Sequence, residues 1–146
     1  MPYRYLIEHN LADMILTAHI FIRQSDDKYP ATLSKNILTG LLREQLKYNG
    51  LVTSDDLEMG AIRNNCTYEQ AIELAIHAGV DILLNSNTKN YDEAISEKTF
   101  QIIRNLVAKK RISEERIDQS FQRIMKLKND FWSGEWICEL KNCAFK

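Results

Sequence analysis

The sequence has few of the features that mark membrane-bound, secreted or nucleic-acid-binding proteins. None of its apolar runs is long enough to span a bilayer, and Met1-Pro2-Tyr3-Arg4-Tyr5 lacks the charged-then-apolar pattern of a signal peptide. The formal net charge is only -1, so neither a nucleic acid nor a membrane is expected as a partner. A length of 146 residues suits one domain with a real core and is short for two.

Cysteine is also scarce. The three thiols of Cys66, Cys138 and Cys143 are an odd number, no histidine lies near the last two, and their spacing differs from that of a zinc ribbon. We therefore expect neither a disulfide framework nor a metal site, and we interpret the three as reduced thiols of a cytoplasmic protein. No cofactor is predicted.

What the sequence does contain is an alternation of apolar runs with amphipathic stretches. After the end of a helix at 2–9, strands are predicted at 13–22, 51–55 and 80–84. Helices are predicted from Ser34 to Asn49, from Thr67 to Ala78, from Asp92 to Lys109 and from Ser113 to Lys128. This order indicates an α/β fold, with parallel strands joined by right-handed crossovers.

Two of the predicted strands are too apolar for the edges of a small sheet. Residues 13–22 form a nearly continuous apolar run, and 80–84 form a second, shorter one. Such runs are typical of parallel strands that are buried on both faces. In a three-stranded sheet both would lie at open edges. The sequence therefore predicts a piece of a larger sheet or barrel.

Two adjacent carboxylates follow the predicted strand at 51–55. Chemistry in α/β proteins gathers at the carboxyl ends of strands, so Asp55 and Asp56 are candidate site residues. The alternative is that they only cap the next helix. Because side chains alternate along a strand, Thr53 and Asp55 share one face and Asp56 points the other way. Asp56 is therefore predicted to position the loop or to cap a backbone amide.

Several blocks of the sequence occur in the order and spacing of one enzyme family. The blocks are Met14–Ile20, Pro30–Ser34, Gly40–Arg43, Ser54–Ile62 and Ala78–Leu84, followed by Arg116–Ser120 and Arg123–Lys128. Together they resemble the β-N-acetylhexosaminidases of glycoside hydrolase family 3, over about residues 2–128. The tail at 129–146 is left unassigned.

This resemblance implies a fold and an activity. The catalytic domain of that family is a TIM (β/α)8 barrel, and residues 13–20, 50–56 and 80–84 would be its sixth, seventh and eighth strands. The chain would then be a partial barrel, with the last three β/α units and the C-terminal helices of the domain at 1–128. The implied activity is removal of terminal β-linked N-acetylglucosamine from a carbohydrate by a retaining mechanism, which in bacteria commonly serves peptidoglycan recycling.

The resemblance also assigns roles to residues. The nucleophile of the family directly follows a Ser or Thr at the end of the seventh strand, which makes Asp55 the catalytic residue here. His19, near the end of the first strand, is predicted to bind the substrate, although a packed core histidine is the alternative. The family's acid/base Asp-His pair and its sugar-gripping residues should precede residue 2. The chain alone is therefore predicted to be inactive or nearly so.

Two other classes of function stay open. The chain could be a non-catalytic remnant or interaction module that is stable through self-association or with a separate N-terminal half of the barrel, and its apolar strand edges support this reading. Alternatively, Asp55 could be the phospho-acceptor of a receiver-like domain. Such a domain has an acidic cluster near its N-terminus, whereas the first strand here offers only Asp13 at its wrong end, which argues against this class.

Overall fold

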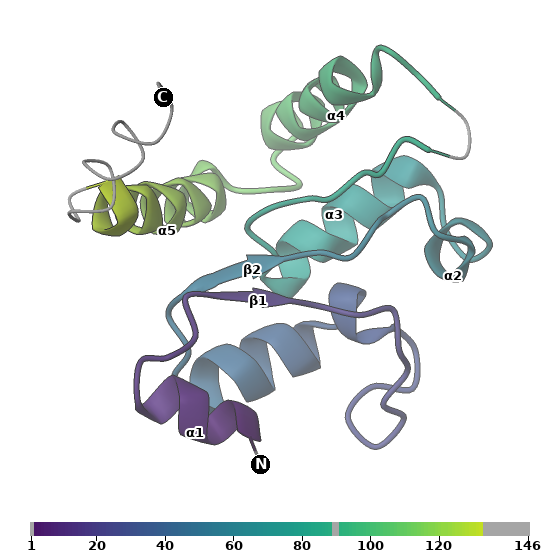
Figure 1. The fold of residues 1–146 in the computed structure, drawn as a ribbon. Helices are drawn as coiled ribbons and strands as arrows, with labels where there is room; N and C mark the ends of the chain where they lie inside the picture. Colours follow the sequence, from purple (N-terminus) through teal and green to yellow (C-terminus); the bar gives the residue numbers. More distant parts are fainter. Residues whose placement is uncertain (1, 89–90, 133–146) are drawn as a thin grey trace, which may run out of the picture.

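The fold is described from a computed structural model, which covers residues 2–88 and 91–132. Its elements are, in order, α1 (Pro2–Glu8), β1 (Met14–Leu16), the 3-10 helix η1 (Ala31–Leu33), the π-helix η2 (Asn36–Gln45), β2 (Leu51–Thr53), α2 (Gly60–Arg63), α3 (Tyr68–Ala78), α4 (Ile95–Ala108) and α5 (Glu114–Trp132). Figure 1 shows the two strands at the centre, with α1 and η2 beneath them and α3 and α4 above them. No helix among the described residues is long and apolar enough to cross a membrane.

A small parallel sheet occupies the centre of the molecule. β1 pairs with β2 in the register Met14 to Leu51 and Leu16 to Thr53. The predicted third strand runs parallel to β2 on its other side, but it forms a single bridge, between Thr53 and Ile82. The mixed helix and strand content, the parallel direction and the spatial order of the three segments agree with the prediction.

All three segments form shorter strands than predicted, and the two outer ones are less buried. β1 ends at Leu16 instead of Ile22, and the side chains of Met14 and Leu16 are 51% and 61% exposed. The segment 80–84 leaves Leu84 exposed. The reason is the same for β1 and for the segment 80–84. Among the described residues, no further strand pairs with their outer edges, so the hydrogen-bonded pairing stops early and their apolar side chains stay exposed.

Two hydrophobic cores lie on either side of α3. One includes Val52 of β2 together with Ala71, Ala75 and Ala78 of α3. The other contains Ile72 and Ile76 from the adjacent face of α3, together with Leu57, Leu106 and Ile112. Because α3 contributes to both cores, it connects the strand layer to α4.

The predicted start at Thr67 and end at Ala78 are confirmed for α3. The helix predicted from Ser34 to Asn49 is instead the π-helix η2, which ends at Gln45, and the helix predicted from Asp92 begins at Ile95. Ser34 Oγ accepts a hydrogen bond from the Ile37 amide at 3.2 Å. Thr67 and Gln70 form the capping box, and Gly79 ends α3 with a φ of 117°, a value that favours glycine. The short helix α2 was not predicted. α5 continues to Trp132, past the predicted end at Lys128, and Cys138 and Cys143 lie outside the described residues.

A buried carboxylate connects the strands to the helices. Asp81, whose side chain is 0% exposed, follows α3 at the start of the segment that runs along β2. Three guanidinium groups bind it, from Arg43 at 2.7 Å, Arg123 at 3.0 Å and Arg116 at 3.5 Å. The Ser120 hydroxyl at 2.7 Å and the Val52 amide of β2 at 3.1 Å donate two further hydrogen bonds. Burial lowers the pKa of Arg43 and Arg116, and the negative charge of Asp81 opposes that effect.

Replacing Asp81 by Asn should therefore destabilise the whole fold. The variant leaves three guanidinium groups without their counter-charge, and breaking a buried ion pair in this way costs about 3–5 kcal/mol. Urea unfolding followed by circular dichroism should show a midpoint far below that of the wild type. As a matched control, Asp118→Asn on the exposed side of α5 should stay within about 0.5 kcal/mol. Equal midpoints for Asp81→Asn and the wild type would refute the central role of Asp81.

Candidate active site

The loop after β2 is fixed to the neighbouring segment by a buried serine. Ser54 is 0% exposed; its amide donates to the Ile82 carbonyl at 2.9 Å, and its Oγ accepts from the Leu84 amide at 2.8 Å. One turn further on, the amide of the fully buried Leu57 donates to the Leu84 carbonyl at 3.1 Å. The residues between Ser54 and Leu57 are thus held at both ends.

Asp55 lies at the carboxyl end of β2 and is half-buried. The bond from Ser54 to Ile82 extends the strand geometry past Thr53, so alternation places Asp55 on the face of Leu51 and Thr53. Its Oδ1 accepts a hydrogen bond from the Asp56 amide at 2.7 Å. Oδ2 accepts none from the described residues. The site therefore presents a partly accessible carboxylate with one oxygen anchored.

Asp56 has the supporting role that was predicted for it. Its Oδ1 accepts from the Glu58 amide at 3.0 Å and from the Ser86 amide at 3.1 Å, and its Oδ2 accepts from the Ser86 hydroxyl at 2.6 Å. Burial raises the pKa of Asp56, but hydrogen bonds from the Ser86 hydroxyl and from the Glu58 and Ser86 amides bring it below its ordinary value. Asp56 thereby fastens the loop after β2 to the loop after the third parallel segment.

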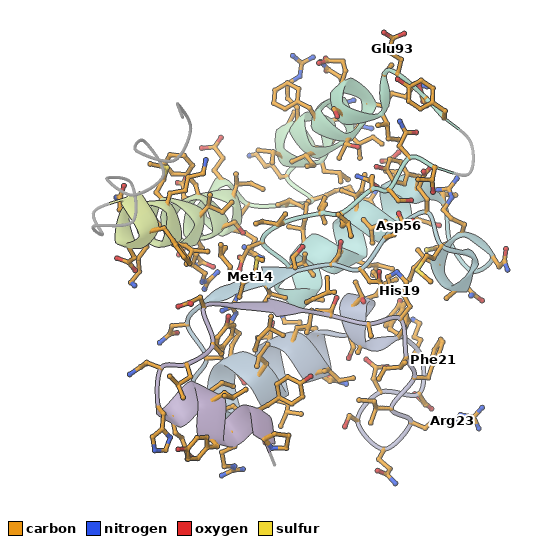
Figure 2. The ribbon with its side chains drawn as sticks, viewed as in Figure 1. Met14, His19, Phe21, Arg23, Asp56 and Glu93 are labelled. Atoms are coloured by element: carbon orange, nitrogen blue, oxygen red, sulfur yellow. The ribbon has the colours of Figure 1, made fainter. Side chains whose placement is uncertain are left out.

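His19 lies next to Asp56, as Figure 2 shows. Its Nε2 lies 2.8 Å from the Asp56 carbonyl oxygen, and its Nδ1 lies 3.0 Å from Thr32 Oγ1. The predicted contact between His19 and a substrate stays a prediction. Both ring nitrogens are engaged by protein groups, so in this arrangement a sugar would meet the carbon edge or the face of the ring.

The other ionisable groups near the site do not approach Asp55. His9, just after α1, donates through Nδ1 to the Tyr5 carbonyl at 2.9 Å, and His77 is exposed on α3. Glu58 precedes α2, and its Oε2 is buried without a hydrogen-bond partner among the described residues. Within residues 2–88 and 91–132, no group of three or more His, Cys, Asp or Glu side chains is arranged to hold a metal ion.

Two features of the site were missed by sequence reasoning. Ser86 belongs to a polar stretch that was interpreted only as the end of a strand, yet its hydroxyl and amide both bind Asp56. Thr17 and Thr32 lie in blocks that carried the family resemblance, and their contact at 2.9 Å leads to His19. A polar residue at the end of each parallel segment was the available signal, because these ends meet at one edge of a sheet.

Comparison with known proteins gives a family and several relatives. The glycosyl hydrolase family 3 N terminal domain matches residues 1–127. A β-hexosaminidase of Pasteurella multocida is 32% identical over 127 residues, which are 84% of this chain and 34% of that protein.

Solved structures agree with this match. A glycoside hydrolase family 3 β-N-acetylglucosaminidase from Paenibacillus superposes with a TM-score of 0.79 and 36% identity, over 88% of this chain and 24% of that one. A β-N-acetylglucosaminidase from Thermotoga maritima gives a TM-score of 0.72 and 28% identity, over 86% and 27%. This chain thus spans only about a third or less of the length of its relatives. The domain match covers most of the sequence, and the chain belongs to glycoside hydrolase family 3.

Proposed function

We propose that this chain supplies the nucleophile of a retaining β-N-acetylhexosaminidase. The observation that carries the proposal is the half-buried Asp55 carboxylate, which stands at the carboxyl end of β2 with its Oδ1 anchored by the Asp56 amide. Sequence position supports it, since Asp55 directly follows Ser54 in a chain of family 3. The substrate class comes from the names of the relatives, which are a β-hexosaminidase and β-N-acetylglucosaminidases.

In a retaining mechanism Asp55 acts in the first of two steps. Its carboxylate attacks the anomeric carbon, the bond to the leaving oxygen breaks, and a covalent glycosyl-enzyme forms. A separate general acid protonates the leaving oxygen, and the same group then removes a proton from the water that releases the sugar. Within the described residues, both ring nitrogens of His19 are engaged by Thr32 and by the Asp56 carbonyl, and the unpartnered Oε2 of Glu58 is buried away from solvent.

We place the chain at the end of the catalytic barrel, as its last three β/α units. The uncovered edge of β1 supports this placement. Met14 and Leu16 share a sheet face with Leu51 and Thr53, yet they are half or more exposed whereas the latter two are buried. A further parallel strand beside β1 would cover them. The share of each relative that the chain matches, 24% to 34%, leaves ample length for such strands.

Joining the proposed preceding part of the barrel to this chain should therefore create activity. In the proposed hybrid, the segment of the Pasteurella relative that precedes its matched region is fused in front of Met1. We expect hydrolysis of 4-nitrophenyl β-N-acetylglucosaminide by the hybrid, none by this chain alone, and a loss of about a thousandfold or more in kcat for the Asp55→Asn hybrid, because removal of a nucleophile abolishes the covalent route.

Asp27→Asn provides the matched control for this assay, because it makes the same chemical change on an exposed loop. Its kcat should equal that of the unmodified hybrid. Full activity in the Asp55→Asn hybrid would contradict the proposal. Robust turnover by this chain alone would contradict the prediction that it needs the preceding part of the barrel for activity.

The Asp56 carboxylate should contribute to the stability of the loop. Its folded-state pKa lies below the unfolded value, so the ionised carboxylate stabilises the fold above about pH 4, and this contribution is lost as pH falls through the lower folded-state pKa. Wild type should exceed Asp56→Asn in unfolding free energy by about 1–3 kcal/mol at pH 7, with the gap closing below about pH 4. Urea unfolding at several pH values measures this gap, and a gap that widens toward low pH would be incompatible with the assignment.

The exposed edge also favours a second candidate, a module that associates with itself or with a separate chain. Sedimentation of the isolated chain should then show concentration-dependent assembly, and Leu16→Lys should abolish it, because lysine on an edge strand blocks pairing. Tyr91→Lys, at a side chain that is 78% exposed and away from the sheet, should leave assembly unchanged. A wild-type chain that stays monomeric at all concentrations would exclude self-association.

A further inference from the structure

A chain of hydrogen bonds crosses the carboxyl end of the sheet toward the Asp55 loop. Thr17 Oγ1, just after β1, lies 2.9 Å from Thr32 Oγ1 in η1. Thr32 Oγ1 lies 3.0 Å from Nδ1 of His19, and Nε2 of His19 lies 2.8 Å from the Asp56 carbonyl oxygen. Thr17 and Thr32 are 7% and 0% exposed, so water does not compete for their hydroxyl groups.

The Asp56 carbonyl, the last group in this series, fixes the direction of the hydrogen bonds. A carbonyl oxygen can only accept, so the proton between His19 and Asp56 belongs to Nε2. In a neutral imidazole, Nδ1 is then an acceptor, and the Thr32 hydroxyl must donate to it. Thr32 Oγ1 in turn accepts from Thr17. Every hydrogen in the series points toward Asp56.

From this geometry we infer that His19 is a positioning residue, which holds Asp56 so that the Asp56 amide stays aimed at the Asp55 carboxylate. Nε2 of His19 donates to the carbonyl oxygen of Asp56, and the Ser86 and Glu58 amides donate to its carboxylate. With both of those groups fixed, its own amide is left directed at Asp55 Oδ1, at 2.7 Å. His19 thus acts on Asp55 through Asp56.

The arrangement has a functional consequence that rests on the proposed role of Asp55. An attacking carboxylate needs one defined orientation, and the contribution of such preorganisation depends on second contacts that lock the first. The loops after β1, β2 and the third parallel segment all meet at Asp56. A change at His19 should therefore loosen the Asp55 turn without touching the hydrophobic cores.

Nitrogen-15 NMR of the full chain tests the first part of the inference directly. The wild-type protein should show His19 as the neutral tautomer that is protonated at Nε2, with the characteristic pair of ring nitrogen shifts. A neutral ring with its only proton on Nδ1 would overturn the inference, because Nε2 could not then donate to the Asp56 carbonyl.

Amide hydrogen exchange tests the second part. Exchange of the Asp56 amide should be about tenfold faster in His19→Ala than in the wild type, since the loss of one hydrogen bond of ordinary strength changes an equilibrium by about that factor. It should return to within about threefold of the wild type in His19→Gln, because the glutamine amide can donate to the Asp56 carbonyl and accept from Thr32. His77→Gln, at an exposed histidine, should have no effect.

The Val52 amide, which is bound to Asp81, reports on the fold as a whole. Positioning predicts no change there in any of the variants. Equal acceleration at Val52 and Asp56, no acceleration at Asp56 in His19→Ala, or an His19→Gln variant as fast as His19→Ala would each overturn the inference. None of these readouts needs enzymatic activity, so they can succeed even where the hybrid enzyme shows that Asp55 is no nucleophile.

Discussion

The fold depends on one buried carboxylate more than on any other polar contact. Asp81 collects guanidinium groups from η2 and α5 and an amide from the middle of β2. Three positive charges around one negative charge are tolerated because the guanidinium groups also donate to backbone carbonyls, as Arg116 does to Val80 at 2.7 Å. This contact fixes where β2 lies relative to the helices, and β2 carries the candidate nucleophile to the edge of the sheet.

Three contacts connect the end of β2 and its loop to the neighbouring segments. Ser54 joins the end of the strand to the third segment, Asp56 joins its loop to Ser86, and His19 joins the same loop to the segment after β1. Three parallel segments thus converge on one turn, which is the arrangement expected where catalytic groups gather in α/β proteins. The middle of β2, by contrast, is held through Asp81 and its guanidinium partners. Stability and the proposed chemistry therefore use different parts of the same strand.

Local signals in the sequence predicted much of this architecture, whereas long-range polar contacts could not be read from it. The capping box at Thr67 and Gln70 and the terminal Gly79 are local, so the bounds of α3 were predictable. The length of β1 could not be predicted. An apolar run indicates that its side chains favour burial, but it does not indicate whether a neighbouring strand is present to pair with it. Asp81 is one charge within an apolar run, but its arginine partners are Arg43, Arg116 and Arg123, which lie far from it in sequence.

The central claim is that Asp55 becomes covalently attached to the sugar. The most direct test is to treat the hybrid enzyme with a fluorinated N-acetylglucosaminyl fluoride, whose good leaving group makes the first step independent of the general acid while the fluorine slows release. Peptide mapping by mass spectrometry should then locate one sugar on Asp55, with none in the Asp55→Asn hybrid. A sugar attached to another residue, or turnover of the reagent without any covalent adduct, would contradict the account.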